Sequence, residues 1–461
     1  MSIAALKSAL PDVAFEENPR IVQQKSRDFY WYSPVLKRQL ENVTAEAVAT
    51  PTTEEDLLKI LGAAYAADVP VTVRGSGTGN YGQAMPLAGG LVLDVSKMNA
   101  IKTVARGHVV AEAGAVLADI DTAVRDTGQE LRLSPSTYHT ASIGGFIAGG
   151  SGGVGSIRWG GLRDAGNIIA VRLALMDGEN PTVVTLKGAD IAKASHAYGT
   201  TGIIIDVEMP LAPAYNWIEI FVSFKDLGDA ARFGETLAGA DGLLLKNLAV
   251  MGPGCTQYFK RHAEFVRPGE TLVVAIAAPF AAGDVIYLAT RAGGTLTMHS
   301  DELDAPARAA LPAAFELCWN HTTLRALRVD PAITYLQVLY PQPGITEKVL
   351  KINDMFGDEV PTHLEFVRFD GAVGCFGLPL VRFTDEARLD EIVRLHEEAG
   401  CPIFNPHRYT LEEGGMKQTD EVQLAFKKKA DPKGLLNPGK MIAWDNPDFD
   451  YGKPYLFPTL T

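Results

Sequence analysis

The stretch VTVRGSGTGNYGQ, residues 71–83, is the feature that most constrains how this chain can fold. Four glycines fall within eight residues, directly after a β-branched run. Glycines at this density indicate either turns with positive φ or a backbone that a ligand approaches closely. Taken alone, the stretch is compatible with a hairpin turn in a strand-rich region and with a phosphate-binding loop.

Three kinds of phosphate-binding loop can be compared with this stretch. A dinucleotide-binding fingerprint needs a helix at once and an acidic residue about 20 positions later. Here Pro86, Gly89 and Gly90 follow, so no helix can start. A Walker A loop needs Gly-Lys-Ser/Thr at its end, which is absent. The remaining type is a strand–loop–strand in which successive backbone N–H groups form an anion-binding nest, with Arg74 adding a positive charge at its entry.

A second glycine-rich stretch, residues 134–169, contains SPSTYHTASIGGFIAGGSGGVGSIRWGG. So many positions without a Cβ are more than a connector needs, and they suit a large flat ligand that lies against backbone. The alternative is a seam of small residues between packed strands.

Composition narrows the functional classes. A chain of 461 residues predicts two or three domains, and 47% hydrophobic with 21% charged residues is typical of a soluble globular protein. A formal net charge of −13 argues against a nucleic-acid binder. The four cysteines are scattered without a CxxC pair, so we expect a reducing, cytoplasmic location and neither a zinc site nor disulfides. We find no signal peptide and no apolar stretch of about 20 residues, so no membrane span is expected.

Local patterns predict an α+β fold with two main domains. Thr53 or Thr52 caps a helix that leads into the strand VPVTV, and several strands follow up to about residue 212. From about Ala214, strands such as NWIEIFVSF and LEFVRF alternate with helices, which predicts an antiparallel sheet with helices. The tail DEVQLAFKKKADPKGLLNPGKM predicts a helix that Pro432 and Gly434 stop, with the lysines at 427–429 on a solvated face.

The ordered segments VPVTVRGSGTGNYG, GGLVLDVSKMNAI, AGA, SPST with SIGGFIAGGSGG, and HAYGTTGII resemble the FAD-binding domains of the vanillyl-alcohol oxidase superfamily. The tail DPKGLLNPGK resembles that of its glycolate/D-lactate dehydrogenase-type members. The resemblance implies a PCMH-type FAD-binding domain with two subdomains, an antiparallel-sheet substrate (cap) domain, and a tail that returns to the FAD domain. The predicted division is an N-terminal extension (1–39), the FAD-binding domain (40–212), the substrate domain (213–395) and the returning segment (396–461).

The resemblance also implies which residues hold FAD. The first loop would bind the pyrophosphate, the second would lie along the isoalloxazine and ribityl chain, and GTTGII would lie near the adenine or ribityl part. The implied residues are Arg74, Gly75, Ser76, Gly77, Thr78, Gly79, Asn80, Tyr81 and Gln83; Ser136, Thr137, Thr140, Ser142, Gly144, Gly145, Gly149, Gly152, Gly153 and Ser156; and Gly202 and Ile204.

Two departures from the family pattern refine this expectation. Many relatives tether FAD through a His or Cys in the first loop, and none stands between Arg74 and Gly90. We therefore expect non-covalent FAD, with His139 the first alternative as a tether. The metal-binding motif of the hydroxy-acid members is not matched, since His363 and Asp370 do not have its spacing and FNPHRYTLEEGGMK replaces GEHG. We expect no metal site, and a simple 2-hydroxy acid becomes a less favoured substrate.

Flavin-dependent oxidation also needs a group that removes a proton, and histidine suits that task near neutral pH. His407, in FNPHRYT near the returning tail, is the first candidate, with Asn405, Arg408 and Tyr409 beside it to orient it or bind substrate. His321, in CWNHTTLRALRVD, is the second. The alternative for His407 is a structural histidine in a turn. The alternative for the CWNHTTLRALRVD stretch around His321 is a helix cap with a solvated face. Tyr30, Trp31 and Tyr32 face either an aromatic substrate or, as we favour, the core.

We therefore expect an FAD-dependent oxidase or dehydrogenase that oxidises a small organic alcohol, hydroxy acid or aromatic alcohol by hydride transfer to flavin N5. Its partners would be the small-molecule substrate and an electron acceptor, which is oxygen, a quinone or a carrier protein; a homodimer is an assembly the sequence allows. A flavin transferase without net redox change and a non-catalytic subunit of a larger dehydrogenase are the two other classes.

Overall fold

The computed structural model describes residues 3–450, which form two compact units. Unit 1 comprises residues up to Ser151, then Leu162–Ala214, and the segment from Pro406 onward. Unit 2 comprises Gly152–Gly161 and Tyr215–Asn405. The second glycine-rich stretch is therefore divided between the two units. The domain boundaries at 39, 212 and 395 stay a prediction, and the structure divides the chain differently.

Unit 1 contains a small sheet that carries the first glycine loop. Its strand order is β1-β2-β4-β3, with β2 and β3 both parallel to β4. Thr53 caps the helix that precedes β3 by accepting a hydrogen bond from the Asp56 amide, as predicted. The elements of this part are α1 Ile3–Ala9, β1 Phe15–Glu16, α2 Pro19–Lys25, α3 Pro34–Leu40, β2 Ala47–Ala49, α4 Glu54–Ala66, β3 Val71–Arg74 and β4 Leu91–Asp94.

A second sheet in unit 1 has the order β5-β6-β10-β8-β9, with β7 paired to β10. The strand pairings within this sheet are antiparallel. Helix α6 occupies the middle of the second glycine-rich stretch. The elements here are β5 Ile101–Ala105, β6 His108–Glu112, α5 Leu117–Arg125, β7 Gln129–Leu131, α6 Ile143–Gly149, β8 Ala170–Ala174, β9 Val183–Lys187 and β10 Ile203–Pro213.

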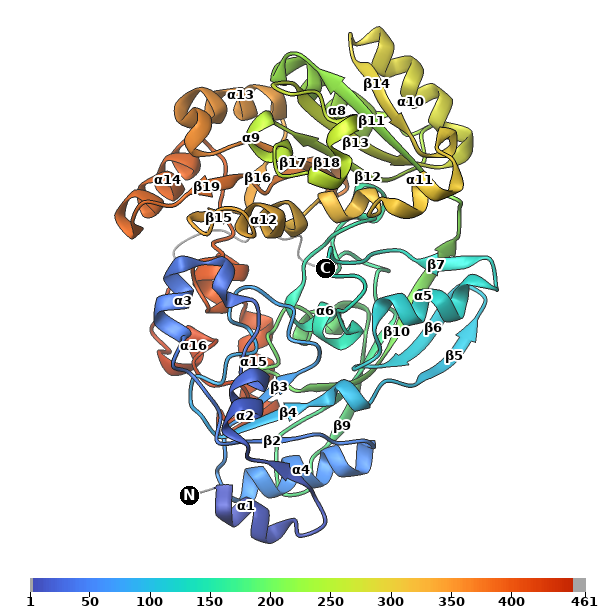
Figure 1. Ribbon diagram of the computed structural model, residues 1–461. Helices are drawn as coiled ribbons and strands as arrows, with labels where there is room; N and C mark the ends of the chain where they lie inside the picture. Colours follow the sequence, from blue (N-terminus) through green and yellow to red (C-terminus); the bar gives the residue numbers. More distant parts are fainter. Residues whose placement is uncertain (1–2, 451–461) are drawn as a thin grey trace. The chain divides into compact units, whose positions relative to one another are not determined.

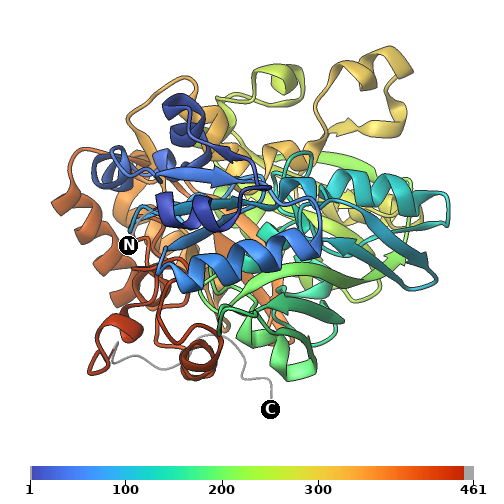
Figure 2. The same ribbon diagram turned by 90° about the horizontal axis from the view of Figure 1, so that it is seen from below.

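The C-terminal segment of unit 1 packs among its earlier elements. Figures 1 and 2 show it in red beside the blue N-terminal segments. Its elements are a π-helical turn at Leu411–Gly415, α15 Glu421–Ala430 and α16 Ile442–Asp445. The lysine run does not lie on a solvated face throughout: Lys427 is buried, whereas Lys428 and Lys429 are exposed. That part of the sequence prediction is wrong, because Lys427 points into unit 1.

Unit 2 is built on a seven-stranded antiparallel sheet, as predicted, with the order β14-β11-β13-β12-β17-β18-β16. Helices α8 and α10 pack on it (Figure 1). The short helix Ser156–Trp159 (α7) contacts β12 and β17. A separate pair, β15 and β19, completes the strands described in this unit.

The bounds of the helices and strands of unit 2 are α7 Ser156–Trp159, β11 Ile218–Phe224, α8 Leu227–Gly239, β12 Leu245–Met251, α9 Pro253–Thr256, β13 Thr271–Ala277, α10 Pro279–Arg291, β14 Thr295–His299, α11 Ala305–Ala310, α12 Asn320–Leu327, β15 Ile333–Tyr335, β16 Val338–Tyr340, α13 Ile345–Phe356, β17 His363–Phe369, β18 Ala372–Gly377, β19 Leu380–Arg382 and α14 Glu386–Glu398.

Among residues 3–450, no helix combines the length and apolar character needed to cross a bilayer. Of the N-terminal aromatics, Tyr30 and Tyr32 are buried in the core, as favoured, whereas Trp31 is 38% exposed.

Candidate functional site: a glycine-lined cradle in unit 1

The loop between β3 and β4 presents a run of unsatisfied backbone donors. The N–H groups of Gly77, Thr78, Gly79 and Asn80 make no hydrogen bond to any residue within 3–450. These residues are only half-buried, apart from the buried Asn80. Successive backbone N–H groups on one loop can form a nest that binds an anion, and these four are open for that role.

The Arg74 side chain holds the backbone of this loop in place. Its Nη1 donates to the carbonyl oxygens of Lys25 (3.0 Å) and Arg27 (2.5 Å), and its Nη2 donates to the carbonyl of Ser76 (3.0 Å). Burial lowers the pKa of this guanidinium, and the carboxylates of Asp94 and Asp28 oppose that shift. Arg74 therefore holds the loop in shape and supplies positive charge, while the backbone amides provide the open hydrogen-bond donors.

Two glycines of the loop are required by close approach. Gly77 has φ of +66°, and a Cβ there would collide with the Arg74 guanidinium. A Cβ at Gly75 would collide with the hydroxyl of Ser142, which accepts a hydrogen bond from the Ser76 amide at 3.4 Å. The glycines thus let side chains of the site pack directly against the loop backbone.

The second glycine-rich stretch meets the first loop within unit 1 at two points. Ser142, directly before α6, makes the contact with Ser76, and Gln83 Nε2 donates to the Gly149 carbonyl at 3.3 Å. Gln83 Oε1 also accepts from the Tyr81 amide at 3.1 Å, which closes the end of the first loop. These contacts bring the two stretches together into one cradle.

The other predicted cofactor residues lie in three further parts of the chain. Ser136, Thr137 and Thr140 precede α6, and Gly144 and Gly145 lie in its first turn, where the Gly144 amide already donates to the Ala113 carbonyl. Gly152, Gly153 and Ser156 belong to unit 2, where Ser156 Oγ accepts from the Gly153 amide at 3.0 Å. Gly202 and Ile204 lie at the start of β10, against β8.

Sequence reasoning did not include Asn437 and Lys440 among the site residues, although it quoted the motif LLNPGK that contains them. Both are buried, and both donate to backbone carbonyls at the end of the first loop, Asn437 to Gln83 and Lys440 to Gly82. The signal available in the sequence was an Asn and a Lys in a turn-like motif, since such side chains need hydrogen-bond partners where they are buried.

His407 lies in unit 1 and is 2% exposed. Its Nδ1 lies 2.7 Å from Ser33 Oγ, which also accepts a hydrogen bond from the Leu36 amide at the start of α3. Tyr409, two residues later, places its ring 5.0 Å from Lys440 Nζ. The returning segment therefore brings His407 and Tyr409 to the N-terminal elements of the same unit.

His321 and Asn405 lie in unit 2. His321 is in the first turn of α12, and the residue before the helix, Trp319, has φ of +52°, which is strained for a residue with a side chain. Asn405 is buried at the end of the unit. The structure does not bring these two together with His407 inside one unit.

A buried polar network holds the strained turn before α12. Glu365 accepts hydrogen bonds from the Trp319 amide (2.7 Å) and from Asn247 Nδ2 (3.1 Å), and it lies 2.8 Å from His363 Nε2. The Trp319 indole donates to Asn247 Oδ1 at 3.1 Å. This network fixes the first turn of α12, and with it the backbone of His321.

Within residues 3–450 there is no group of three or more His, Cys, Asp or Glu residues arranged to hold a metal ion. His363 instead pairs with Glu365, and Asp370 lies in the turn between β17 and β18.

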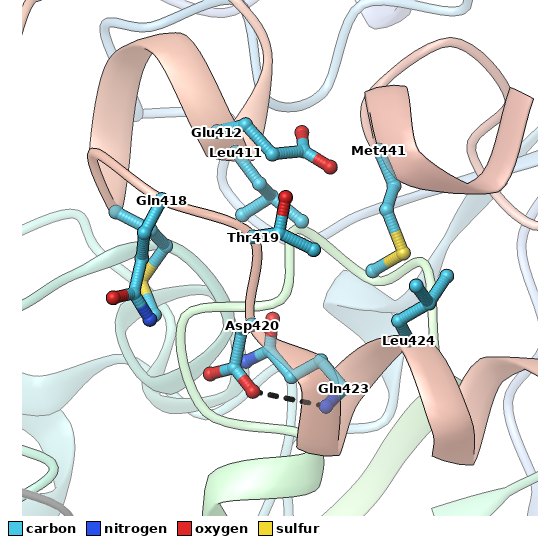
Figure 3. A pocket seen from close by; sticks show the side chains of 9 residues that line it. Leu411, Glu412, Gln418, Thr419, Asp420, Gln423, Leu424 and Met441 are labelled. Atoms are coloured by element: carbon cyan, nitrogen blue, oxygen red, sulfur yellow. Dashed lines mark hydrogen bonds between the residues drawn. The ribbon is translucent and has the colours of Figure 1, made fainter. Parts of the chain in front are cut away.

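Figure 3 shows a small cavity beneath the π-helical turn of unit 1. Its volume is about 10 Å³, enough for about one water molecule. Its walls include polar groups from Glu412, Thr419 and Gln423 and the side chains of Met416 and Met441. It is far too small for a cofactor, so the candidate site is the cradle rather than this cavity.

Comparisons with known proteins bear on the part of the chain that contains the cradle. Residues 45–183, which contain the first loop and α6, match the family model of FAD binding domains. An uncharacterized FAD-linked oxidoreductase of Mycobacterium tuberculosis is 35% identical over 211 residues, and the alignment covers 44% of each chain. The chain thus spans less than half the length of that relative.

Two further comparisons extend over more of the chain. The glycolate oxidase subunit GlcD of Bacillus subtilis is 24% identical over 440 residues, covering 87% of this chain and 89% of that protein. A solved alkyldihydroxyacetonephosphate synthase has the same fold, with a TM-score of 0.73, 13% identity, and coverage of 95% of this chain and 85% of that one. The latter likeness establishes the predicted α+β fold.

Proposed function

We propose that the chain is an FAD-dependent oxidoreductase of the PCMH and vanillyl-alcohol oxidase type, because residues 45–183 match the family model of FAD binding domains. Its substrate would be a small organic alcohol, hydroxy acid or aromatic alcohol. The relative that aligns over most of this chain carries the name of a glycolate oxidase subunit, which supports a hydroxyl-bearing donor. The absence of the family's metal motif from the sequence favours donors other than simple 2-hydroxy acids.

The single observation that carries the proposal is the run of four amides at residues 77–80 without an acceptor. They lie inside the matched domain, next to the positive charge of Arg74. A pyrophosphate offers several anionic oxygens, which such donors bind well. The chemistry of the donor set therefore fits the phosphates of FAD.

We assign cofactor binding to the two loops predicted from the sequence, with Ser142 and Gln83 joining them. We propose non-covalent attachment, since no His or Cys stands between Arg74 and Gly90 and His139 is exposed on the surface. Retention of the cofactor would then depend on hydrogen bonds and burial alone.

When bound, the flavin supplies a hydride acceptor. The chain's own task is to orient the donor and to take the hydroxyl proton. We assign proton removal to the His407 imidazole, whose Nδ1 is held by Ser33, with Tyr409 and Asn405 as substrate-binding candidates. His321, on the turn that Glu365 fixes, is the second candidate. Oxygen, a quinone or a carrier protein would then accept the electrons.

Anaerobic flavin bleaching tests this function. The purified protein would be mixed with a panel of donors that includes glycolate, D-lactate and aromatic alcohols, while visible absorption is followed. We expect at least one hydroxyl-bearing donor to bleach the flavin. A protein whose flavin is bleached by dithionite but by no donor of these classes would contradict the proposed oxidoreductase and favour a transferase without net redox change.

A further inference from the structure

The C-terminal segment continues the small sheet of unit 1 at its free edge. In the order β1-β2-β4-β3, strand β3 is an edge strand. The Val71 amide donates to the Leu435 carbonyl at 2.8 Å, and the Asn437 amide donates to the Val71 carbonyl at 2.8 Å. Residues 435–437 therefore run parallel to the strand that leads directly into the first loop.

Asn437 connects two backbone segments of the cradle. Its Nδ2 donates to the carbonyl of Gln83 at 2.8 Å and to the carbonyl of Tyr198 at 2.7 Å. Its Oδ1 lies 3.3 Å from the Thr72 hydroxyl, which donates to it. All three hydrogen-bonding groups of the side-chain amide are thus used, and its φ of +44° is one that asparagine tolerates.

Lys440 fixes the neighbouring carbonyl. Its Nζ is fully buried and donates to the Gly82 carbonyl at 2.7 Å. Burial lowers the pKa of Lys440 to about 7, against the opposing effect of Asp28. A buried ammonium is costly unless its partners are well placed, so this contact depends on the loop keeping its conformation.

Lys427, in helix α15, also binds backbone carbonyl groups with a buried ammonium. Its Nζ donates to the carbonyls of Thr200 (2.9 Å) and Leu436 (3.2 Å) and to Asp431 Oδ2 (2.7 Å). Thr200 lies in the GTTG turn, two residues after Tyr198. Lys427, Asn437 and Lys440 therefore bind carbonyl oxygens at two places beside the cradle, the end of the first loop and the GTTG turn.

We propose that residues 427–440 form a latch whose docking is coupled to FAD binding. The latch holds the carbonyls of Gly82 and Gln83, just past the open amides of residues 77–80. A loop whose carbonyl groups are already held in place loses less conformational entropy when its amides bind an anion. Because such coupling is reciprocal, bound FAD would also hold the latch in place. This proposal rests on the proposed FAD binding and makes Asn437 and Lys440 positioning residues.

The variant Asn437→Gly tests the latch with little backbone strain, because glycine adopts positive φ freely. Asn446→Gly, at an exposed position beyond the latch, is the control. The Kd of FAD would be measured by ultrafiltration of the purified holoprotein. Losing the three side-chain hydrogen bonds of Asn437 should raise the Kd of Asn437→Gly about 10- to 100-fold, and Asn446→Gly should match the wild type.

Limited trypsin digestion gives a second readout that needs no variant. Lys429 and Lys433 are exposed cleavage points in the latch. Cleavage there should slow at least several-fold in wild-type protein with FAD relative to the same protein after FAD removal. Equal cleavage rates, or an Asn437→Gly protein with wild-type Kd, would overturn the latch while leaving FAD binding intact. A wild-type protein that binds no FAD would instead overturn the proposed function, and the latch with it.

Discussion

At Gly77 the backbone has positive φ and the Arg74 guanidinium lies where a side chain would start. We therefore predict that Gly77→Val abolishes FAD retention. Gly107→Val is the matched control, since Gly107 has φ of +88° and a Cβ there would meet nothing within 4 Å. The control should lose about 1–2 kcal/mol of stability from strain alone and keep its flavin. Equal flavin-to-protein absorbance ratios in the two variants would contradict the assignment of the loop.

His407 is assigned to proton removal, with Ser33 orienting its ring. His407→Ala should slow flavin reduction by substrate about 10²- to 10⁴-fold while FAD stays bound. Stopped-flow reduction and the visible spectrum measure the two effects separately. Ser33→Ala should slow reduction less and cost about 1 kcal/mol through the lost cap of α3. Unchanged reduction kinetics in His407→Ala would remove His407 from the mechanism and leave His321 as the candidate.

His196 predicts a specific pH dependence of stability. Burial, and next the charge of Arg163, lowers the pKa of His196 to about 4, below its ordinary value of 6.5. Between these values the unfolded chain binds more protons than the folded one, so stability falls as pH drops from 6.5 to 4. The loss attributable to His196 is of the order of 3 kcal/mol.

The comparison variant is His196→Asn, because asparagine suits the φ of +54° at this position. Urea unfolding at pH 7 and pH 4 should show a smaller loss of stability in the variant than in the wild type. Parallel losses in both proteins would show that His196 does not titrate as the structure requires.

At the scale of elements, α15 carries a buried lysine beside two exposed ones. Lys427 is 2% exposed and pairs with Asp431 at 2.7 Å. Lys427→Met leaves Asp431 buried without its cation, which should cost about 3–5 kcal/mol. Lys428→Met, one position along the same helix, should stay within about 0.5 kcal/mol of the wild type. Thermal unfolding of the two variants decides the matter, and equal midpoints would contradict the buried role of Lys427.

The same helix shows which element-level features can be predicted from sequence. The caps and hydrophobic periods are local, so the helix after Thr53 and the stop near Pro432 follow from nearby residues. The burial of Lys427 is not local, because one of its acceptors is Thr200, 227 residues away. A run of three lysines gives no local sign that one of them points inward.

At the scale of the whole molecule, the order of the glycine-rich segments predicts the FAD-binding domain and the α+β fold correctly. It does not predict that residues 152–161 pack with the later sheet, where the Gly155 amide donates to the Lys246 carbonyl at 2.8 Å. It also does not identify Asn437, whose partner Tyr198 is 239 residues away. Contacts at such separations depend on tertiary packing, which local patterns do not encode.

The most direct test of the whole account is the visible absorption spectrum of the purified full chain, repeated on the supernatant after acid precipitation. We predict flavin bands that pass entirely into the supernatant, as expected for non-covalent FAD on the open amides of residues 77–80. Bands that stay with the pellet would contradict non-covalent attachment and make His139 the first tether to examine. If no flavin bands appear even after FAD is added, the chain does not bind FAD, which contradicts the proposed function.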